Sequence, residues 1–578
     1  MKRALPLVLL LAAACSSLPR SSEPVHVVIV GTTDVHGWYN GHVEVPEGGG
    51  EGVLIGGLAS FAGHVEALRA AHGGRVIVVD AGDLFQGTIE SNMFEGEPMV
   101  RGYNAIGYAA MAIGNHEFDF GPVGPEPLAR GANEDSLGAL KRNAGLARFP
   151  FLSANMVEKS SGRTPSWARP YTIVSKGGAR IGIIGLTTPD TPNVTMAVNV
   201  ASLEFTDPVA ATIAAARELR QRGVDAIVAV AHMGGRCRDT SDPHLLDSCD
   251  PSQEAMQILE ALPAGTIDAW FGGHTHARMA HFVNGVAVAQ AAPYSREFST
   301  IDLWIEPKND RVVRKEIREH TMICSFVYSG TEHCQPSKAP AGARLEPRTF
   351  SGMTIRPDAR VAAAMEPYLR RVALKRDEML GVTAAANFPR SYWNESPLGN
   401  LVADALREAT GAEVALMNSG GIRADLPAGP LTYGDVYAVS PFDNYPTMVV
   451  MTGEQLTQIL GAMSGGARGI LQVSGVRYTI DHAKETDVPA TSRNRVVSVT
   501  LSDGSPLDPA KYYAVVMPDF VAAGGDGTGD VMGSIPAHRI QIFYAKPIRD
   551  VLIEVLRKRT TPLTPALDGR ITVLNPAP

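Results

Sequence analysis

One stretch of the sequence organises the rest of the chain: Gly114-Asn115-His116-Glu117-Phe118-Asp119. An apolar run at residues 108–113 precedes it and predicts a buried strand, and Gly114 then favours a turn. An amide, an imidazole and two carboxylates therefore arrive together at a strand end, where open α/β sheets place their ligand sites. We expect this stretch to lie at the centre of the functional site.

Other predicted strands, at residues 25–30, 75–79, 226–231 and 267–271, also end in a sharp turn followed by groups that bind hard metal ions. Each such residue alone is more often a turn former or a core histidine, but that interpretation would have to hold at every strand end. The candidate ligands are Asp34, His36, Asp83, Asn115, His232, His274 and His276. Oxygen and imidazole ligands without thiolate suit Mn, Zn, Fe, Mg or Ca. The set exceeds what one ion needs, so we predict two divalent ions, with Asp83 able to bridge them.

Length and charge limit the classes of function. At 578 residues the chain is too long for one core, so at least two domains are expected. The net charge of −8 argues against binding to a nucleic-acid polymer, which needs a basic face. An anionic small substrate remains compatible with this charge, because bound metal reverses its sign locally.

Residues 1–15 are predicted to be a targeting segment. Lys2 and Arg3 precede an apolar run that is too short to span a bilayer, and small residues then lead to Cys15. This ending is similar to a bacterial lipobox, and it predicts an acylated Cys15 and attachment to a membrane. The alternative is ordinary secretion at a small-residue site. Both predict an exported protein, periplasmic or at the cell surface.

Four cysteines remain after the targeting segment: Cys237, Cys249, Cys324 and Cys334. An even number in an exported chain indicates disulfides, for which three connectivities are possible. The short-loop choice pairs the first two and the last two. A zinc site made from all four thiolates is the alternative, and the spacing within each pair disfavours it.

Strand and helix patterns alternate through the first half, which predicts a layered α/β domain over residues 24–350. The pattern weakens at 305–348, which we interpret as an excursion from that domain. Apolar residues at helical spacing then predict a linker helix over 357–380. A second α/β domain is expected over 381–575.

The chain resembles the calcineurin-like metallophosphoesterases, and within them the exported 5′-nucleotidase/UDP-sugar hydrolase/2′,3′-cyclic phosphodiesterase family. The blocks that carry the resemblance in the first half are Asp34-Val35-His36, Gly82-Asp83, Gly114-Asn115-His116-Glu117, His232 and Gly273-His274-Thr275-His276. Those in the second half are residues 398–404, Asn418-Ser419-Gly420-Gly421-Ile422-Arg423 and residues 519–527. The match covers nearly the whole mature chain, and the motifs come in family order.

The resemblance implies a four-layer αββα sandwich domain joined by a helix to a second α/β nucleotidase domain. It assigns Asp34, His36, Asp83 and His276 to one metal, and Asp83, Asn115, His232 and His274 to the other. His116 and Asp119 would form a catalytic dyad. A metal-bound hydroxide would then attack phosphorus in line, while His116 stabilises charge on a phosphoryl or leaving oxygen.

The same resemblance places the substrate's nucleoside in the second domain. Phe442 and Phe520 would stack on either side of the base, with Arg423 at the phosphate. Asp526 would bind a ribose hydroxyl and Asn418 the base edge. The family usually has a phosphate-binding arginine three residues before Glu395, where this chain has Tyr392. Arg390 is the nearest candidate to replace it.

The expected activity is hydrolysis of nucleoside 5′-monophosphates to nucleoside and phosphate. A 2′,3′-cyclic nucleotide phosphodiesterase or a UDP-sugar hydrolase is the alternative among enzymes. A surface nucleotide-binding protein with a degraded site is an alternative of another class, and the complete ligand set argues against it. A thiosulfate-ester hydrolase would share the first domain, but would not need the nucleoside loop at 520–526.

Overall fold

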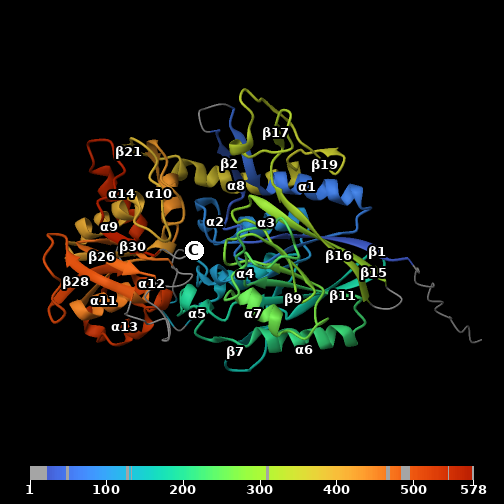
Figure 1. Ribbon diagram of the computed structural model, residues 1–578, viewed down its shortest axis with the longest axis horizontal. Helices are drawn as coiled ribbons and strands as arrows, with labels where there is room; N and C mark the ends of the chain where they lie inside the picture. The colour runs from blue at the N-terminus through green and yellow to red at the C-terminus, as the bar shows by residue number, and fades with distance from the viewer. Residues whose placement is uncertain are drawn as a thin grey trace, which may run out of the picture.

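The computed structural model consists of two domains that lie side by side (Figure 1). The described residues are 23–46, 51–124, 129, 131, 133–306, 311–463, 469–482, 495–543 and 546–575. The predicted targeting segment, including Cys15, lies outside them. Among the described residues, no helix combines the length and the apolar character needed to cross a membrane.

The first domain contains two six-stranded sheets. The first sheet has the order β16 (Arg311–Met322), β15 (Glu297–Glu306), β1 (Val25–Thr32), β4 (Val76–Asp80), β5 (Ala110–Ala112) and β6 (Phe151–Leu152). The second has the order β13 (Met279–Val283), β14 (Val286–Gln290), β12 (Ala269–Gly272), β11 (Ala226–His232), β9 (Ala179–Thr187) and β8 (Tyr171–Lys176).

The two sheets pack face to face, and helices cover both outer faces. Ile29 and Val79 of the first sheet meet Ile183, Val230 and Phe271 of the second in one buried cluster. The outer helices are α1 (Leu58–Ala71), α3 (Glu97–Ile106) and α4 (Gly138–Leu146) on the first sheet, and α6 (Pro208–Gln221) and α7 (Glu254–Ala261) on the second. This arrangement confirms the predicted αββα sandwich.

The central strands of each sheet run parallel, so their carboxyl ends reach the same edge. β1, β4 and β5 are mutually parallel neighbours, as are β9, β11 and β12. Such strands are buried on both faces, which explains their continuous apolar sequences. The turns after these strands therefore converge on one region of the domain.

The prediction of an excursion at residues 305–348 was wrong for its first half. Arg311–Met322 is the edge strand β16, paired antiparallel with β15 in the main sheet. Its outward side chains are charged because one face meets solvent, and this removed the apolar signal. The true excursion comprises β17 (Phe326–Tyr328), β18 (Leu345–Pro347), β19 (Thr349–Phe350) and β20 (Met353–Thr354).

Both disulfides form as the short-loop choice predicted. Cys324 bonds to Cys334 inside a small apolar cluster beneath the excursion, with Ile55 and Tyr328 as neighbours. Cys237 bonds to Cys249 in the first domain.

One helix, α8 (Ala359–Arg376), contributes to the cores of both domains. Asp358 caps it by accepting the N–H groups of Arg360 and Val361. Met365 packs in the first core and Val372 in the second. The observed helix is shorter than the predicted 357–380, because the chain turns into strand β21 (Met379–Ala384).

The second domain is built on a five-stranded sheet, with smaller sheets beside it. The order is β25 (Leu471–Ser474), β22 (Val414–Asn418), β28 (Tyr512–Pro518), β24 (Pro446–Thr452) and β29 (Ile540–Ile542). Helices α9 (Pro397–Thr410), α10 (Tyr433–Val439) and α14 (Ile548–Arg557) pack on one face. On the other lie α11 (Gly453–Ala462), α13 (Gly529–Gly533) and the smaller sheet of β27 (Val496–Leu501), β26 (Val476–Asp481) and β30 (Ile571–Leu574). Strand β23 (Gly429–Thr432) pairs with β21.

Candidate active site

The organising stretch begins as the short helix η1 (Asn115–Phe118), directly after β5. Gly114 is needed at the turn, because a Cβ there would lie 2.2 Å from Oδ1 of Asp83. That close approach brings the turn after β5 against the turn after β4. Asp83 Oδ1 in turn accepts the backbone N–H of His116 at 2.9 Å.

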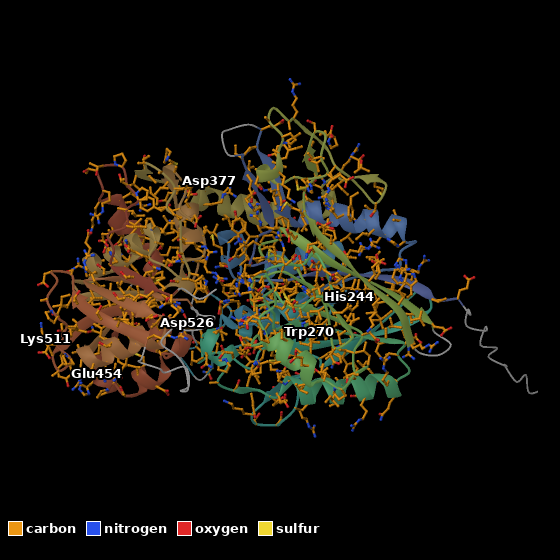
Figure 2. The ribbon with its side chains drawn as sticks, in the orientation of Figure 1. His244, Trp270, Asp377, Glu454, Lys511 and Asp526 are labelled. Atoms are coloured by element: carbon orange, nitrogen blue, oxygen red, sulfur yellow. A yellow bond between two sulfur atoms is a disulfide. The ribbon has the colours of Figure 1, made fainter. Side chains whose placement is uncertain are left out.

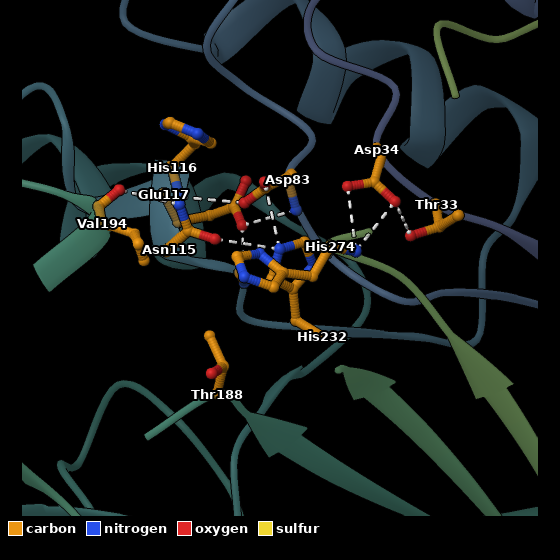
Figure 3. A network of polar contacts seen from close by, with 12 residues as sticks. Thr33, Asp34, Asp83, Asn115, His116, Glu117, Thr188, Val194, His232 and His274 are labelled. Carbon is orange, nitrogen blue, oxygen red and sulfur yellow. Dashed lines mark hydrogen bonds and ion pairs between the residues drawn. The ribbon is translucent and has the colours of Figure 1, made fainter. Parts of the chain in front are cut away.

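The predicted metal ligands gather at the shared strand edge in two groups. Figure 3 shows Asp34 of the first group beside Asp83, His232 and His274 of the second. In each group, one candidate ligand atom per residue lies within 4.8 Å of the others. The first group comprises Asp34, His36 and His276, and the second comprises Asp83, His232 and His274. Asn115 joins the second through its Oδ1, which lies 3.0 Å from Nε2 of His232. Asp83 also approaches the first, with Oδ2 at 3.7 Å from Nε2 of His36.

The orientation of two imidazoles fits the binding of cations. Nδ1 of His232 faces the carbonyl oxygen of Ala81 at 2.9 Å, and Nδ1 of His36 faces that of Gln86 at 2.8 Å. A nitrogen that faces a carbonyl carries the proton, so each Nε2 presents a lone pair to the site. Nε2 of His232 then converges with the oxygens of Asp83 and Asn115, all of which are acceptors. A divalent cation satisfies such a donor set.

The electrostatics of the second group also call for positive charge. Burial alone would lower the pKa of His232, but the charge and hydrogen bond of Asp83 raise it to about 10. Burial alone would raise the pKa of Asp83, but His232 and His116 hold it well below its usual range. The charge of Asp83 raises the pKa of His232, and the neighbouring imidazoles lower the pKa of Asp83, so this buried carboxylate favours a positive charge beside it.

Most of the candidate ligands adopt a backbone conformation that is rare for residues other than glycine. The residues with positive φ are Asp34 (50°), His36 (50°), Asp83 (58°), His274 (75°) and His276 (53°). Such conformations raise the free energy of the folded state and cluster at functional sites. Here they turn five side chains toward one point within a few residues of their strands.

Glu117 is a residue to which the sequence assigned no role. Its Oε2 accepts the N–H groups of Asp83 (2.9 Å) and Gly114 (2.7 Å). Its Oε1 accepts those of Leu84 (2.7 Å) and Phe85 (3.3 Å). This buried carboxylate therefore ties the turn after β4 to the turn after β5. Its position in the quoted stretch was the only signal for it.

His116 and Asp119 form a hydrogen-bonded pair beside the metal ligands. Nδ1 of His116 lies 2.6 Å from Oδ2 of Asp119, and the other carboxylate oxygen accepts from the hydroxyl of Thr195 at 2.8 Å. Burial opposes protonation of His116, but the charge of Asp119 raises its pKa above the ordinary value. The imidazole therefore favours its charged form, with Nδ1 donating to Asp119 and Nε2 left to act on a ligand.

The second domain brings all of its predicted substrate residues to the same place. β22 and β28 are parallel, so Asn418 at the end of β22 and Phe520 in α12 (Asp519–Ala522) after β28 share one edge. Figure 2 shows Asp526 on the side that faces the first domain, far from Lys511 and Glu454. A single cavity of about 410 Å³ lies between the domains. Its lining includes Asp83, Asn115, His116, Asp119, His274, His276, Arg390, Asn418, Arg423, Phe442, Phe520 and Asp526.

Arg423 and Phe442 reach from the second domain to the first. Nη2 of Arg423 lies 3.3 Å from Nε2 of His36. The ring of Phe442 lies 5.6 Å from that of His116 and 5.7 Å below the guanidinium of Arg423. Phe442, the predicted base-stacking residue, and Arg423, the predicted phosphate-binding residue, therefore lie next to the His116–Asp119 pair.

Asn418 and Asp526 are bonded to each other on the wall of the cavity. Nδ2 of Asn418 donates to Oδ2 of Asp526 at 2.8 Å. Oδ1 of Asn418 is buried and has no hydrogen-bond partner among the described residues. A buried acceptor without a partner is unfavourable, so this oxygen is available to a donor group of a ligand.

Arg390 stays a prediction as the replacement for the family's arginine. It lines the cavity, but its Nη1 donates to the carbonyl oxygen of Ile422 at 3.4 Å, and its N–H is held by Asp425. Tyr392 also lines the cavity, with its hydroxyl beside Gly420. Among the described residues, Arg423 is the arginine that contacts a candidate metal ligand.

Several cavity residues were missed by the sequence reasoning. Tyr294 lies with its hydroxyl 3.4 Å from Nδ1 of His276. Gln86 is buried, and neither polar atom of its side chain has a partner among the described residues. Thr195 holds the dyad, and Arg236 lines the wall beside Thr275. These residues lie in irregular segments without periodicity, so only proximity in the fold identifies them.

Comparison with known families divides the chain as the fold does. Residues 27–278 match the family described as calcineurin-like phosphoesterase. Residues 378–533 match the family described as 5′-nucleotidase, C-terminal domain.

Individual relatives span both domains. A 5′-nucleotidase of Vibrio cholerae is 27% identical over 554 residues, which cover 89% of this chain and 88% of that protein. Endonuclease YhcR of Bacillus subtilis is 28% identical over 506 residues, and the match spans 86% of this chain but 37% of that protein. The crystal structure of a 5′-nucleotidase precursor from Thermus thermophilus has a TM-score of 0.74 and 27% identity, covering 96% of this chain and 100% of that one.

Proposed function

The chain belongs to the calcineurin-like phosphoesterases with a 5′-nucleotidase C-terminal domain, and we propose that it hydrolyses nucleoside 5′-monophosphates to nucleoside and phosphate. Its family consists of metal-dependent phosphoester hydrolases. The observation that carries the proposal is the shared cavity, lined by candidate metal ligands on one side and by candidate nucleoside residues on the other. Such a cavity accommodates a ligand with a phosphate at one end and a base at the other.

The metal assignment follows the two groups of ligands. One ion would be held by Asp34, His36, Asp83 and His276, and the second by Asp83, Asn115, His232 and His274. Two divalent ions bound there would supply Lewis acidity and activate a water for in-line attack on phosphorus. Mn, Zn, Mg, Fe and Ca all suit these ligands.

The chain's own residues then orient the substrate and move the proton. Phe442 and Phe520 would hold the base between their rings, which contributes about 1–3 kcal/mol by stacking. Arg423 would neutralise charge on the phosphoryl oxygens. His116, kept protonated by Asp119, would donate a hydrogen bond to a phosphoryl or leaving oxygen. Asp526 would accept from a ribose hydroxyl, and Asn418 would bind the base edge or a neighbouring hydroxyl.

A second candidate, hydrolysis of 2′,3′-cyclic nucleotides, is favoured by one observation. Tyr392 is neutral where the resembled family has a phosphate-binding arginine, and Arg390 is bonded to Ile422 instead. A site with fewer cations discriminates less strongly in favour of a dianionic monoester over a monoanionic diester.

The test is phosphate release by the mature protein with Mn²⁺, and then with EDTA. The substrates are AMP, UMP, 2′,3′-cyclic AMP, UDP-glucose and p-nitrophenyl phosphate. Metal-dependent turnover led by AMP or UMP supports the proposal. Turnover led by the cyclic ester supports the second candidate, and no turnover with metal bound leaves a nucleotide-binding protein.

We also propose that the protein is exported and anchored through an acylated Cys15. The two disulfides support an oxidising compartment. A Cys15→Ala variant should move from the membrane fraction to the soluble exported fraction. Equal partitioning of both forms would contradict the anchor and leave secretion intact.

A further inference from the structure

One loop of the first domain contacts the turn after β5, the His116–Asp119 pair and the second domain, although nothing in its sequence marks it as functional. We call residues 191–199 the strap. The strap begins as the short helix α5 (Thr191–Val194), follows β9 and lies over η1. Figure 1 shows α5 at the side of the first domain that faces α12 of the second.

Three hydrogen bonds join the strap to η1 and its end. Nδ2 of Asn115 donates to the carbonyl oxygen of Val194 at 3.0 Å (Figure 3). The hydroxyl of Thr195 donates to Oδ1 of Asp119 at 2.8 Å. Nδ2 of Asn199 donates to the carbonyl oxygen of Phe118 at 2.8 Å. The strap therefore orients a candidate metal ligand, the acidic member of the dyad and the backbone between them.

The first of these bonds fixes which atom of Asn115 faces the metal site. Because its Nδ2 is bonded to Val194, its Oδ1 points toward Nε2 of His232. In the second bond Oδ1 of Asp119 accepts from Thr195, while Oδ2 faces Nδ1 of His116. Thr195 is almost completely buried, so water does not replace its hydroxyl.

The strap also meets the second domain. α5 contacts η6 (Gly525–Gly527), the turn that carries Asp526. Val194, Thr195 and Met196 line the same cavity as Phe520 and Asp526. The loop that would bind the ribose hydroxyl thus rests on the segment that aligns the dyad.

We propose that Thr195 is a positioning residue for the His116–Asp119 pair, and that the strap couples a seated nucleoside loop to alignment of that pair. The inference rests on the proposed function, because it takes the pair as the catalytic dyad. When η6 is seated on α5, the strap is confined between η6 and η1, so Thr195 holds Asp119 in one rotamer. A substrate that engages the nucleoside loop favours this arrangement, and a substrate without a nucleoside does not.

The test compares Thr195→Val, which removes the hydroxyl at nearly constant volume, with Thr195→Ser, which keeps it. Thr212→Val is the matched control, because the hydroxyl of buried Thr212 donates to Pro208 in α6, away from the cavity. For Thr195→Val we expect kcat for AMP to fall by about 10-fold, as for other groups that orient a site residue, with KM changed less than about twofold. We expect kcat for p-nitrophenyl phosphate to fall by less than about threefold. Thr195→Ser should restore the AMP rate, and metal content and melting temperature should match those of the wild type.

Each result decides one part of the inference. An unchanged kcat for AMP in Thr195→Val would overturn the positioning role. Equal losses on both substrates would overturn the coupling, because the strap would then be a fixed support. A second readout does not need activity: hydrogen exchange at the amides of 116–119 should accelerate in metal-free Thr195→Val and not in Thr212→Val. If the wild type shows no phosphatase activity and exchange is still faster in Thr195→Val, the proposed function is contradicted. The role of the strap in holding η1 would then still be supported.

Discussion

The imidazole of His116 lies close to the candidate metal ligands and is not itself one of these candidates. Its Nδ1 contacts Oδ2 of Asp119, and the charge of Asp119 raises the pKa of the imidazole above its ordinary value. Replacing it by asparagine removes the proton donor and leaves the ligands in place. For His116→Asn we expect kcat to fall by about 10²–10⁴ with two metals still bound per chain. Metal analysis beside the kinetics checks this, and loss of metal would contradict the dyad assignment.

For a change at Glu117 we expect the opposite result, a loss of metal affinity. Each of its oxygens accepts two backbone N–H groups, from the turns that carry Asp83 and Asn115. In Glu117→Gln an amide N–H₂ would face two of these donors, so the turns must shift. We expect metal affinity to weaken by about 10–100-fold, measured by titration of the metal-free protein. Glu413→Gln is the control, since Glu413 accepts the N–H of Ala514 on the outside of the second domain. Equal metal affinity in both variants would show that Glu117 is not needed to hold the turns.

At this scale, the sequence identified residues that belong to repeated local patterns. The candidate ligands follow apolar strands, so their convergence could be predicted from the parallel topology alone. Thr195, Tyr294 and Gln86 follow no such pattern. They lie in irregular loops, and the tertiary structure brings them to the cavity. Arg390 was predicted from proximity in sequence alone, and in the structure it lines the cavity while its guanidinium donates to the carbonyl oxygen of Ile422.

Among the elements, the excursion depends on its disulfide. Cys324 and Cys334 are 10 residues apart and pack in a small cluster separate from the main cores. A double Cys324→Ser, Cys334→Ser variant should lose about 2–3 kcal/mol of local stability, since short loops gain somewhat less than long ones. We expect faster hydrogen exchange confined to residues 323–350, with unchanged phosphate release. Loss of activity would instead indicate that the excursion supports the site.

Helix α1 contains a histidine that responds to acid. His64 is buried, its Nδ1 donates to the carbonyl of Ser60, and burial lowers its pKa to about 3. In the unfolded chain the pKa is about 6.5, so between these values the unfolded state binds a proton that the folded state does not. The free energy of unfolding should therefore fall as pH drops through this window, by up to about 1.4 kcal/mol per pH unit.

Urea unfolding of the metal-free protein between pH 4 and 7 measures that slope. His64→Gln, which keeps a donor but does not titrate, should flatten it. His244→Gln is the control, because His244 is exposed and lies in the same domain (Figure 2). Equal slopes in wild type and His64→Gln would show that other groups set the acid sensitivity.

Elements were predictable from sequence where both faces of a strand are buried. β4 and β11 were found with boundaries close to those observed, because nearly every residue in them is apolar. β16 was missed because an edge strand exposes charged residues on one face. The end of α8 was misplaced because Met379 and Leu380 of β21 come seven and eight residues after Val372, a spacing that also fits a helix.

For the whole molecule, the central expectation is that recognition of the base depends on the second domain and chemistry on the first. Phe520 lines the shared cavity from the second domain, where it lies in α12. Phe520→Ala should raise KM for AMP by about 5–150-fold, which corresponds to one stacking contact. Hydrolysis of p-nitrophenyl phosphate should be nearly unchanged. Phe326→Ala, at an exposed position in the excursion, is the control, and equal losses on both substrates would contradict the stacking role.

The left-handed backbone at five candidate ligands has a further consequence for how this protein tolerates change. Each such residue raises the free energy of the folded chain by about 1 kcal/mol or more, whether or not a metal is bound. Glycine at Asp34, His276 or their neighbours in this set relieves that strain and removes a ligand at the same time. Selection for heat resistance alone, without a requirement for turnover, would therefore favour substitutions that erase the site.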